Sequence, residues 1–87
     1  MNEMDDIITQ VEFSMNLKIL RERAELTQQQ IADMLHIDRS TYAYYETART
    51  MPDILTLFKL SKIFNVSVEK FFKRNSTILI CKKRKFN

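Results

Sequence analysis

Glycine is absent from this 87-residue chain. Phosphate-binding loops and dinucleotide-binding turns need glycine so that the backbone can approach the phosphates closely, and the absence therefore excludes both. Tight β-hairpins with two-residue turns are disfavoured for a similar reason. The chain also has one proline and no tryptophan. Short helices joined by brief loops are therefore the expected architecture.

Cysteine and histidine occur once each, as Cys81 and His36. A lone cysteine cannot form an internal disulfide, and a lone histidine cannot complete a Cys/His zinc site. We therefore expect no metal and no cofactor, and a reducing, cytoplasmic environment. The N-terminus lacks a signal-peptide pattern, and no run approaches the roughly 18 apolar residues of a membrane span, so we expect no membrane partner.

The size of the chain also argues against an enzyme. A chain of this length buries about 60 to 65% of its unfolded surface, which supports one compact core but no deep cleft between two lobes. No His/carboxylate or Cys/His pair stands out in the sequence. We predict no catalytic residue.

Charge divides the chain into three parts. Residues 1–16 hold four acids and no base, whereas residues 75–87 hold four bases and no acid, and the net charge is +3. With the helix pattern described next, this predicts an acidic extension over residues 1–13, one domain over residues 14–73 and a basic tail over residues 74–87. The basic run 82–85 is either a phosphate-seeking arm or a solubilising tail.

Apolar spacing and capping residues predict helices in the first half of the domain. Ser14 is the expected N-cap of a helix that ends near Glu25. Thr27 and Gln30 form a Thr-x-x-Gln capping box, which predicts the start of a second helix. Asp38 is the expected N-cap of a third helix over residues 39–46.

Two more helices are predicted after Pro52. Asp53 is the expected cap of the first, and Asn65 is its expected left-handed end. Ser67 is the expected start of a short fifth helix. The only β-like run covers residues 77–81. The apolar stripe expected on the fourth helix consists of Ile54, Leu57, Leu60 and Phe64.

Residues 28–47 fit a helix-turn-helix. Ala32 is small where two helices should cross, and Tyr42 and Tyr45 are expected on the inner face of the second helix. The opposite face would then project outward, and a helix fits the DNA major groove, which is about 12 Å wide. That outward face consists of Arg39, Ser40, Ala43 and Tyr44.

Residues 17–72 resemble a lambda-repressor-like helix-turn-helix domain of the Cro/XRE type. The resemblance implies an all-α, compact five-helix fold whose third helix enters the major groove, in a bacterial, archaeal or phage regulator. Two positions where the family often has glycine are His36 and Ala48, and Ala48 predicts either a different loop or a strained backbone costing about 1 kcal/mol. The matching blocks are Leu17-Lys18-Ile19-Leu20-Arg21, Leu26-Thr27-Gln28-Gln29-Gln30-Ile31-Ala32, Arg39-Ser40-Thr41-Tyr42, Glu46, Pro52, Leu57, Asn65-Val66-Ser67-Val68 and Phe71.

The resemblance implies a phosphate contact for Gln28, at the start of a helix whose N–H groups also favour anions. Arg39 could bind guanine or a phosphate, and Tyr44 could pack on a thymine methyl group or reach the backbone. Ser40 and Thr41 could contact DNA or cap their own helix. The expected DNA-binding residues are Gln28, Arg39, Ser40, Thr41, Ala43, Tyr44, Thr47, Arg49 and Thr50.

Two acids near this face are predicted to have structural roles. Asp38 is explained as an N-cap, and Glu46 is expected to fix Arg49 or the loop backbone. The loop that carries Thr47, Arg49 and Thr50 is expected to follow the phosphate backbone.

The predicted function is a sequence-specific double-stranded DNA-binding regulator, most simply a repressor. One recognition helix discriminates too few base pairs, so we expect a homodimer on an inverted repeat with half-sites about 34 Å apart. Phe71, Phe72 and residues 77–81 are the candidate dimer contacts. The alternative is a protein-interaction module, such as an antitoxin-like or anti-regulator subunit, whose terminal extensions bind a protein partner.

Overall fold

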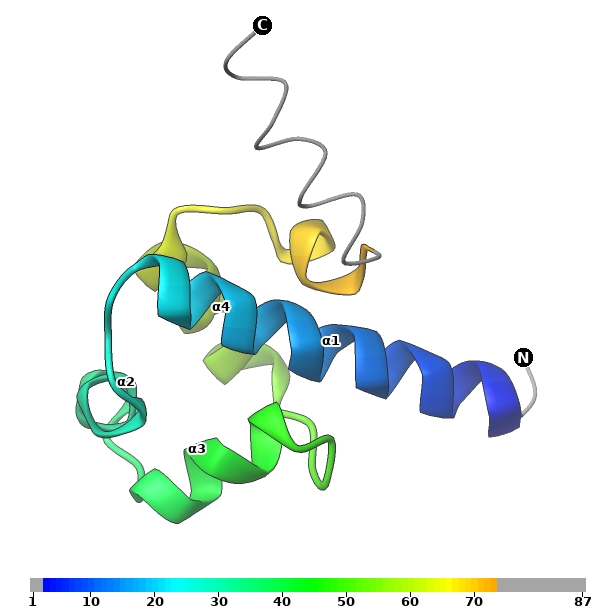
Figure 1. Ribbon diagram of the computed structural model, residues 1–87, viewed down its shortest axis with the longest axis horizontal. Helices are drawn as coiled ribbons and strands as arrows, with labels where there is room; N and C mark the ends of the chain where they lie inside the picture. Colours follow the sequence, from blue (N-terminus) through cyan, green and yellow to red (C-terminus); the bar gives the residue numbers. More distant parts are fainter. Residues whose placement is uncertain (1–2, 74–87) are drawn as a thin grey trace, which may run out of the picture.

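The computed structural model describes residues 3–73, which form four α-helices and one 3₁₀ helix (Figure 1). The all-α fold is confirmed, but the predicted fifth α-helix is a single 3₁₀ segment. The β-like run 77–81, the basic run 82–85 and Cys81 lie outside the described residues. The elements are α1 (Glu3–Arg23), α2 (Gln28–Leu35), α3 (Arg39–Glu46), α4 (Ile54–Phe64) and η1 (Val68–Phe72).

Helix α1 begins eleven residues before the predicted N-cap Ser14. Ser14 is buried inside the helix, where its hydroxyl donates to the carbonyl of Val11 at 2.8 Å. The acidic sequence that suggested a separate extension instead suits the first turns of a helix, where the helix dipole favours negative charge. No glycine or proline interrupts the segment. Helix α1 therefore runs continuously into the domain.

Both ends of α2 follow the sequence prediction. Thr27 Oγ1 accepts from the Gln30 N–H at 3.1 Å, and Gln30 Oε1 accepts from the Thr27 N–H at 2.8 Å. The helix ends at His36, which takes the left-handed conformation with φ 59°. The N–H of Ile37 then bonds the carbonyl of Ala32 at 3.0 Å. Histidine thus fills a position that commonly holds glycine, at a mild steric cost.

Three further residues have positive φ without being glycine. Asn65 ends α4 as predicted, with φ 55°, and Asp53 caps its start by accepting from the Thr56 N–H at 2.8 Å. Ala48 has φ 63°, so the loop after α3 adopts the strained alternative. Glu25, with φ 59° after α1, was not anticipated. Asp38 occupies the N-cap position of α3, but its side chain makes no capping hydrogen bond.

The core lies where α1, α2 and α3 meet, and it is closed by α4 and η1. Phe71 is fully buried with its ring centroid 5.6 Å from that of Phe13, and Phe72 also packs on Phe13 at 5.6 Å. The suggested dimer contact at Phe71 is therefore wrong, because this ring is inside the domain. The buried apolar residues are Phe13, Leu17, Ile31, Ala32, Leu35, Tyr42, Tyr45, Leu60 and Phe71.

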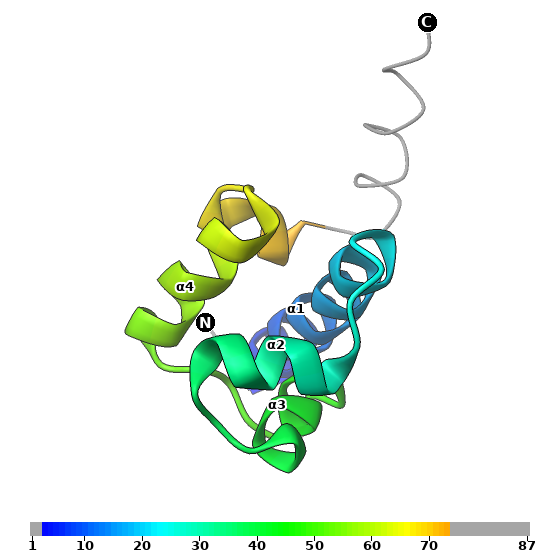
Figure 2. The same cartoon turned by 90° about the vertical axis from the view of Figure 1, so that its left-hand side faces the viewer.

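The predicted stripe on α4 is only partly correct. Leu60 is fully buried, and Leu57 and Phe64 pack against the core. Ile54 is 73% exposed, because it begins the helix at a point where the core does not reach. Figure 2 shows α4 to the left of α1, with α2 and α3 toward the bottom of the view. No helix among residues 3–73 has the length and apolar character needed to cross a membrane.

Asn16 ties η1 to the middle of α1. This side chain is completely buried, and its Nδ2 donates to the carbonyl of Phe71 at 2.8 Å and to the carbonyl of Lys73. The five residues of η1 are too few to form a stable α-helix. The carbonyls of Phe71 and Lys73 at its end accept from Asn16 instead of from a following helical turn. Buried Asn16 therefore holds η1 and Lys73 against the middle of α1.

Replacing Asn16 by alanine should lower the free energy of unfolding by about 2 kcal/mol, because two carbonyls lose their donor in a buried environment. Urea denaturation measures this change. The control is Lys18→Ala on the exposed side of α1, which should change stability by about 0.5 kcal/mol or less. Equal effects of the two substitutions would contradict the role given to Asn16.

Candidate nucleic-acid interface

Helix α3 has one buried face and one face open to solvent. Tyr42 is fully buried and Tyr45 nearly so, and their rings meet edge to face with centroids 6.0 Å apart. Both are core residues, as the sequence predicted. On the outward side, Arg39, Ser40 and Tyr44 are exposed. The structure therefore brings the predicted reading residues of α3 together on one surface.

Two of the predicted residues on α3 differ from this group in position. Ala43 lies on the outward face but is half-buried, so it offers a small surface that a groove wall could approach. Thr41, also half-buried, lies about 100° around the helix from Ser40, on the flank away from Arg39.

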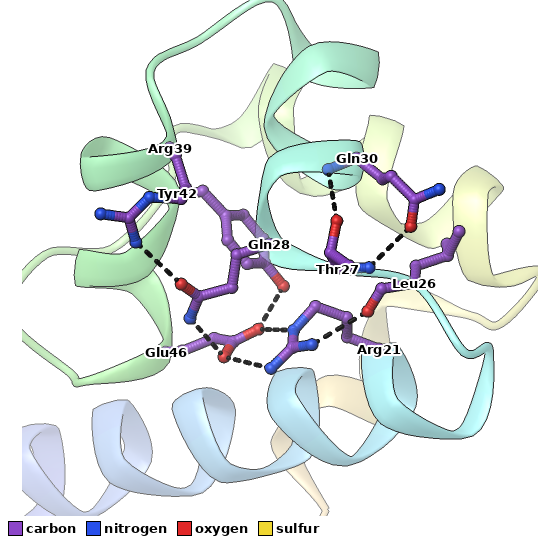
Figure 3. A network of polar contacts seen from close by, with 8 residues as sticks. All are labelled: Arg21, Leu26, Thr27, Gln28, Gln30, Arg39, Tyr42 and Glu46. Atoms are coloured by element: carbon purple, nitrogen blue, oxygen red, sulfur yellow. Dashed lines mark hydrogen bonds and ion pairs between the residues drawn. The ribbon is translucent and has the colours of Figure 1, made fainter.

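Glu46, at the end of α3, is paired with Arg21 of α1 rather than with Arg49. Arg21 Nε donates to Glu46 Oε2 at 2.6 Å, and Nη2 donates to Oε1 at 3.2 Å (Figure 3). The two side chains are 13% and 3% exposed, respectively. The sequence prediction that Glu46 fixes Arg49 or the loop is thus wrong, because the carboxylate turns inward.

Three more hydrogen bonds complete this buried network. The Tyr42 hydroxyl donates to Glu46 Oε2 at 2.6 Å, and Gln28 Nε2 donates to Oε1 at 3.0 Å. Arg21 Nη1 donates to the carbonyl of Leu26 at 2.9 Å, in the turn between α1 and α2. The carboxylate of Glu46 consequently joins three helices, and we refer to Arg21, Gln28, Tyr42 and Glu46 as the Glu46 network.

The network keeps Glu46 ionised. Burial by itself raises the pKa of the carboxyl, but hydrogen bonds from Arg21, Tyr42 and Gln28 outweigh it, and the net pKa is lowered. The Glu46 hydrogen bond raises the pKa of Arg21 against the opposing effect of burial. Burial, followed by the bond to Glu46, raises the pKa of the Tyr42 hydroxyl, which therefore stays protonated as a donor.

Gln28 connects this buried network to the exposed face. While its Nε2 donates to Glu46, its Oε1 accepts from Arg39 Nη1 at 3.1 Å (Figure 3). The amide is thereby oriented at both ends, and Arg39 is drawn toward the start of α2. Sequence reasoning selected Gln28 and Arg39 separately but missed their contact. It also missed Arg21, which is separated from Glu46 by 25 residues and gave no local signal.

The loop after α3 folds back onto Tyr44. The guanidinium of Arg49 lies 5.4 Å from the centre of the Tyr44 ring, a cation–π geometry. The Tyr44 carbonyl accepts from the backbone N–H of Arg49 at 3.0 Å and from Thr47 Oγ1 at 3.3 Å. Thr50, exposed as well, places its N–H 3.4 Å from the same carbonyl. The positive φ of Ala48 makes this return possible, and Arg49 joins the α3 surface.

The chain belongs to the helix-turn-helix family, in its Cro/C1 (XRE) branch. The family model matches residues 17–71, which include α2 and α3 with the Glu46 network. Because the match spans both the buried core and the outward face, it covers the whole candidate interface.

Individual relatives agree with this assignment. An uncharacterised helix-turn-helix transcriptional regulator of Bacillus subtilis, YqaE, is 44% identical over 64 residues, covering 74% of this chain and 55% of that protein. A transcriptional regulator from Listeria innocua has a TM-score of 0.66 at 30% identity, covering 86% of this chain and 75% of that one. The restriction-modification controller C.AhdI from Aeromonas hydrophila shares the fold, with a TM-score of 0.67 at 24% identity over 72% of this chain and 96% of its own. The chain spans about half the length of the curated relatives it matches.

Replacing Glu46 by glutamine should make stability less dependent on pH in acid. The pKa of Glu46 is below its usual value of 4.5 in the folded state, so its stabilising contribution is present above that pH and is lost as pH falls through the lowered pKa. The native chain should therefore lose more stability than Glu46→Gln between about pH 5 and pH 3.

At neutral pH the same substitution should lower the free energy of unfolding by about 3 kcal/mol, because it leaves Arg21 buried without its ion-pair partner. Denaturant titrations across the pH range measure both effects. Glu22→Gln, at an exposed position one residue from Arg21, is the matched control. This variant should lose as much stability as the native chain when the pH falls from about 5 to 3. If the free energy of unfolding fell equally with pH in the native chain and in Glu46→Gln, the lowered pKa assigned to Glu46 would be contradicted.

Proposed function

We propose that this chain is a sequence-specific double-stranded DNA-binding transcriptional regulator that inserts α3 into the major groove. The observation that carries the proposal is the outward face of α3, where Arg39, Ser40 and Tyr44 are exposed side by side. A helix with such a face fits the groove, and arginine is the side chain best matched to guanine O6 and N7. The relatives named as transcriptional regulators support the same function.

Burial of Glu46 supports the proposal electrostatically. Glu46 is the only acid within α3, and its carboxylate is turned inward and paired with Arg21. The outward face of α3 therefore presents Arg39 to a polyanion without a carboxylate of the same helix beside it. The cost of burying the charge is offset by the hydrogen bonds of the Glu46 network.

Gln28 is positioned to contact a phosphate at the start of α2. The first N–H groups of a helix and the positive end of its dipole favour an anion, and Gln28 is the first residue of α2. Its amide is already oriented by Glu46 and Arg39. We propose that Arg39 leaves Gln28 Oε1 to reach a base edge, while the second N–H of Gln28 Nε2 donates to the phosphate backbone.

The loop surface supplies the second set of backbone contacts. Arg49, held against Tyr44, with the exposed Thr47 and Thr50, offers one charge and two hydroxyls along the path expected for a phosphate strand. Ser40 and Thr41 add donors at the other end of α3. Ala43 leaves room for the groove wall between Arg39 and Tyr44.

We further propose that the chain acts as a homodimeric repressor on an inverted repeat. A single α3 reads too few base pairs to select a genomic site, and two copies related by a two-fold axis would read half-sites about 34 Å apart. The first turns of α4 expose Ile54, Leu55 and Phe58, each by more than half of its surface. This patch is the dimer surface we assign, and occupancy of the operator would be enough to exclude polymerase.

Arg39→Ala should weaken binding to the best duplex by about 1 to 3 kcal/mol and relax the base preference at one position per half-site. Selection of bound sequences from a random duplex pool measures the base preference, and titration of the most enriched sequence measures the binding free energy. Arg49→Ala, assigned to the phosphate backbone, should instead weaken all sequences about equally. Failure of the native chain to enrich any sequence would exclude the proposed function.

Leu55→Glu should shift the chain toward monomer, because it places a charge within the α4 patch. Sedimentation at increasing concentration measures the equilibrium. The control is Lys62→Glu, at an exposed position in the last turn of the same helix. A native dimer that Leu55→Glu leaves unchanged would exclude this surface, without affecting the assignment of α3 to the groove.

A further inference from the structure

The four α-helices within residues 3–73 all end in the same kind of turn. A residue in the left-handed conformation follows each helix, and the N–H after it bonds a carbonyl five residues earlier, which is a Schellman motif. The left-handed residues are Glu25, His36, Ala48 and Asn65. The bonds run from the N–H groups of Leu26, Ile37, Arg49 and Val66 to the carbonyls of Arg21, Ala32, Tyr44 and Ser61, respectively. The motif also brings the side chains of each bonded pair close together.

Three of these turns place an apolar residue against the core. Leu26, Ile37 and Val66 are half-buried and pack against the buried core residues. An apolar contact of this kind commonly accompanies the motif. The turn after α3 differs, because the equivalent residue is Arg49, which is charged and exposed. Ending α3 does not require a cation at this position, and the arginine therefore indicates a function at the surface.

Arg49 is held at both of its ends by one residue. Its N–H donates to the Tyr44 carbonyl at 3.0 Å, and its guanidinium lies over the Tyr44 ring, 5.4 Å from the ring centre. The face of an aromatic ring is negative and attracts a cation. A guanidinium carries its N–H donors in its own plane, so stacking on a ring leaves these donors for a phosphate at its edge. A ring and a phosphate can therefore contact the same guanidinium at the same time.

The contact with Arg49 also limits what Tyr44 itself can bind. Tyr44 is 41% exposed, but the ring face under the guanidinium is not available to a thymine methyl group. The Tyr44 carbonyl is engaged as well, since it accepts from the Arg49 N–H and from Thr47 Oγ1 at 3.3 Å. Both the ring and the main chain of Tyr44 therefore serve the loop that follows α3.

We propose that Tyr44 is a positioning residue, which acts on DNA through Arg49 and does not read a base. Its ring holds the Arg49 guanidinium beside the end of α3, where the loop is expected to follow a phosphate strand. Restraining this long side chain before binding reduces the rotamer entropy that it loses at the phosphate. The proposal rests on the proposed function, because it requires Arg49 to contact DNA, but the contact between the two side chains is present without DNA.

The first measurement uses the full chain without DNA. The ring current of Tyr44 should shift the NMR signals of the Arg49 Hδ protons upfield, because these protons lie next to the guanidinium over the ring. Tyr44→Leu should remove the shift, and Tyr44→Phe, which keeps the ring, should preserve it. The Hδ signals of Arg39, whose guanidinium contacts Gln28, are the control and should not move. Identical Arg49 signals in the native chain and in Tyr44→Leu would overturn the proposal, whether or not the chain binds DNA.

The second measurement is the affinity for the duplex that selection with the native chain enriches most. Tyr44→Leu should weaken binding about 2- to 5-fold, the range of an exposed cation–π contact. The same substitution in an Arg49→Ala background should have no further effect, because the cation is already absent. Tyr44→Phe should bind like the native chain. An equal loss from Tyr44→Leu with and without Arg49, or a loss from Tyr44→Phe as large as that from Tyr44→Leu, would overturn the proposal.

The base preference separates positioning from reading. A residue that acts through a phosphate contact should weaken all sequences about equally, so selection with Tyr44→Leu should return the same sequence as selection with the native chain. A preference relaxed at one position would make Tyr44 a base reader and overturn the proposal.

Two controls complete the design. Tyr44 and Arg49 are both exposed, so the fold is expected to persist in every variant, and unchanged chemical shifts of the buried core verify this. Enrichment of no sequence by the native chain would sink the proposed function and the role of Tyr44 together. When the native chain binds its duplex, the contradicting outcomes given above overturn the role of Tyr44 alone.

Discussion

The ion pair between Arg21 and Glu46 is the interaction on which the arrangement of the three N-terminal helices depends. Taking two charges out of water costs several kcal/mol per ion, and the pair compensates for this cost only when its remaining hydrogen-bonding atoms are satisfied. Here two bonds join Arg21 to Glu46, and Tyr42 and Gln28 supply two more. Because these side chains come from α1, α2 and α3, the carboxylate fixes how the helix-turn-helix is placed on the long first helix.

The same interaction shapes the surface proposed to meet DNA. An acid at the end of a recognition helix would oppose a polyanion, and its inward orientation removes that conflict. The charge is used instead to orient Gln28, whose amide in turn holds Arg39. A buried electrostatic contact thus orients the half-buried Gln28, which reduces the entropy that a DNA contact by this side chain would otherwise have to offset.

Local sequence signals were sufficient for the helix-turn-helix but not for its surroundings. The capping box at Thr27, the left-handed His36 and the limits of α3 depend on neighbouring residues, and all three were predictable. The start of α1 was not, because Ser14 has the character of an N-cap and only tertiary packing shows it to be buried within the helix. The partner of Glu46 lies 25 residues away, a separation at which neither capping nor periodicity carries information.

The candidate site likewise combines features that the local sequence predicts with contacts that it does not. The pattern of α3 predicted which residues face outward, since that depends only on helical periodicity and the buried tyrosines. The contacts of Arg49 with Tyr44, and of Arg39 with Gln28, depend on the backbone of two turns whose conformation the sequence left open. At Ala48 both loop alternatives were consistent with the sequence, and the left-handed one brings Arg49 back to α3.

The most direct test of this account is the structure of the chain bound to a duplex obtained by selection. The account predicts α3 in the major groove with Arg39 at a base edge, Gln28 at a phosphate, and the Arg21–Glu46 pair unchanged beneath them. A complex in which the outward face of α3 points away from the duplex, or in which Glu46 has left Arg21, would contradict it.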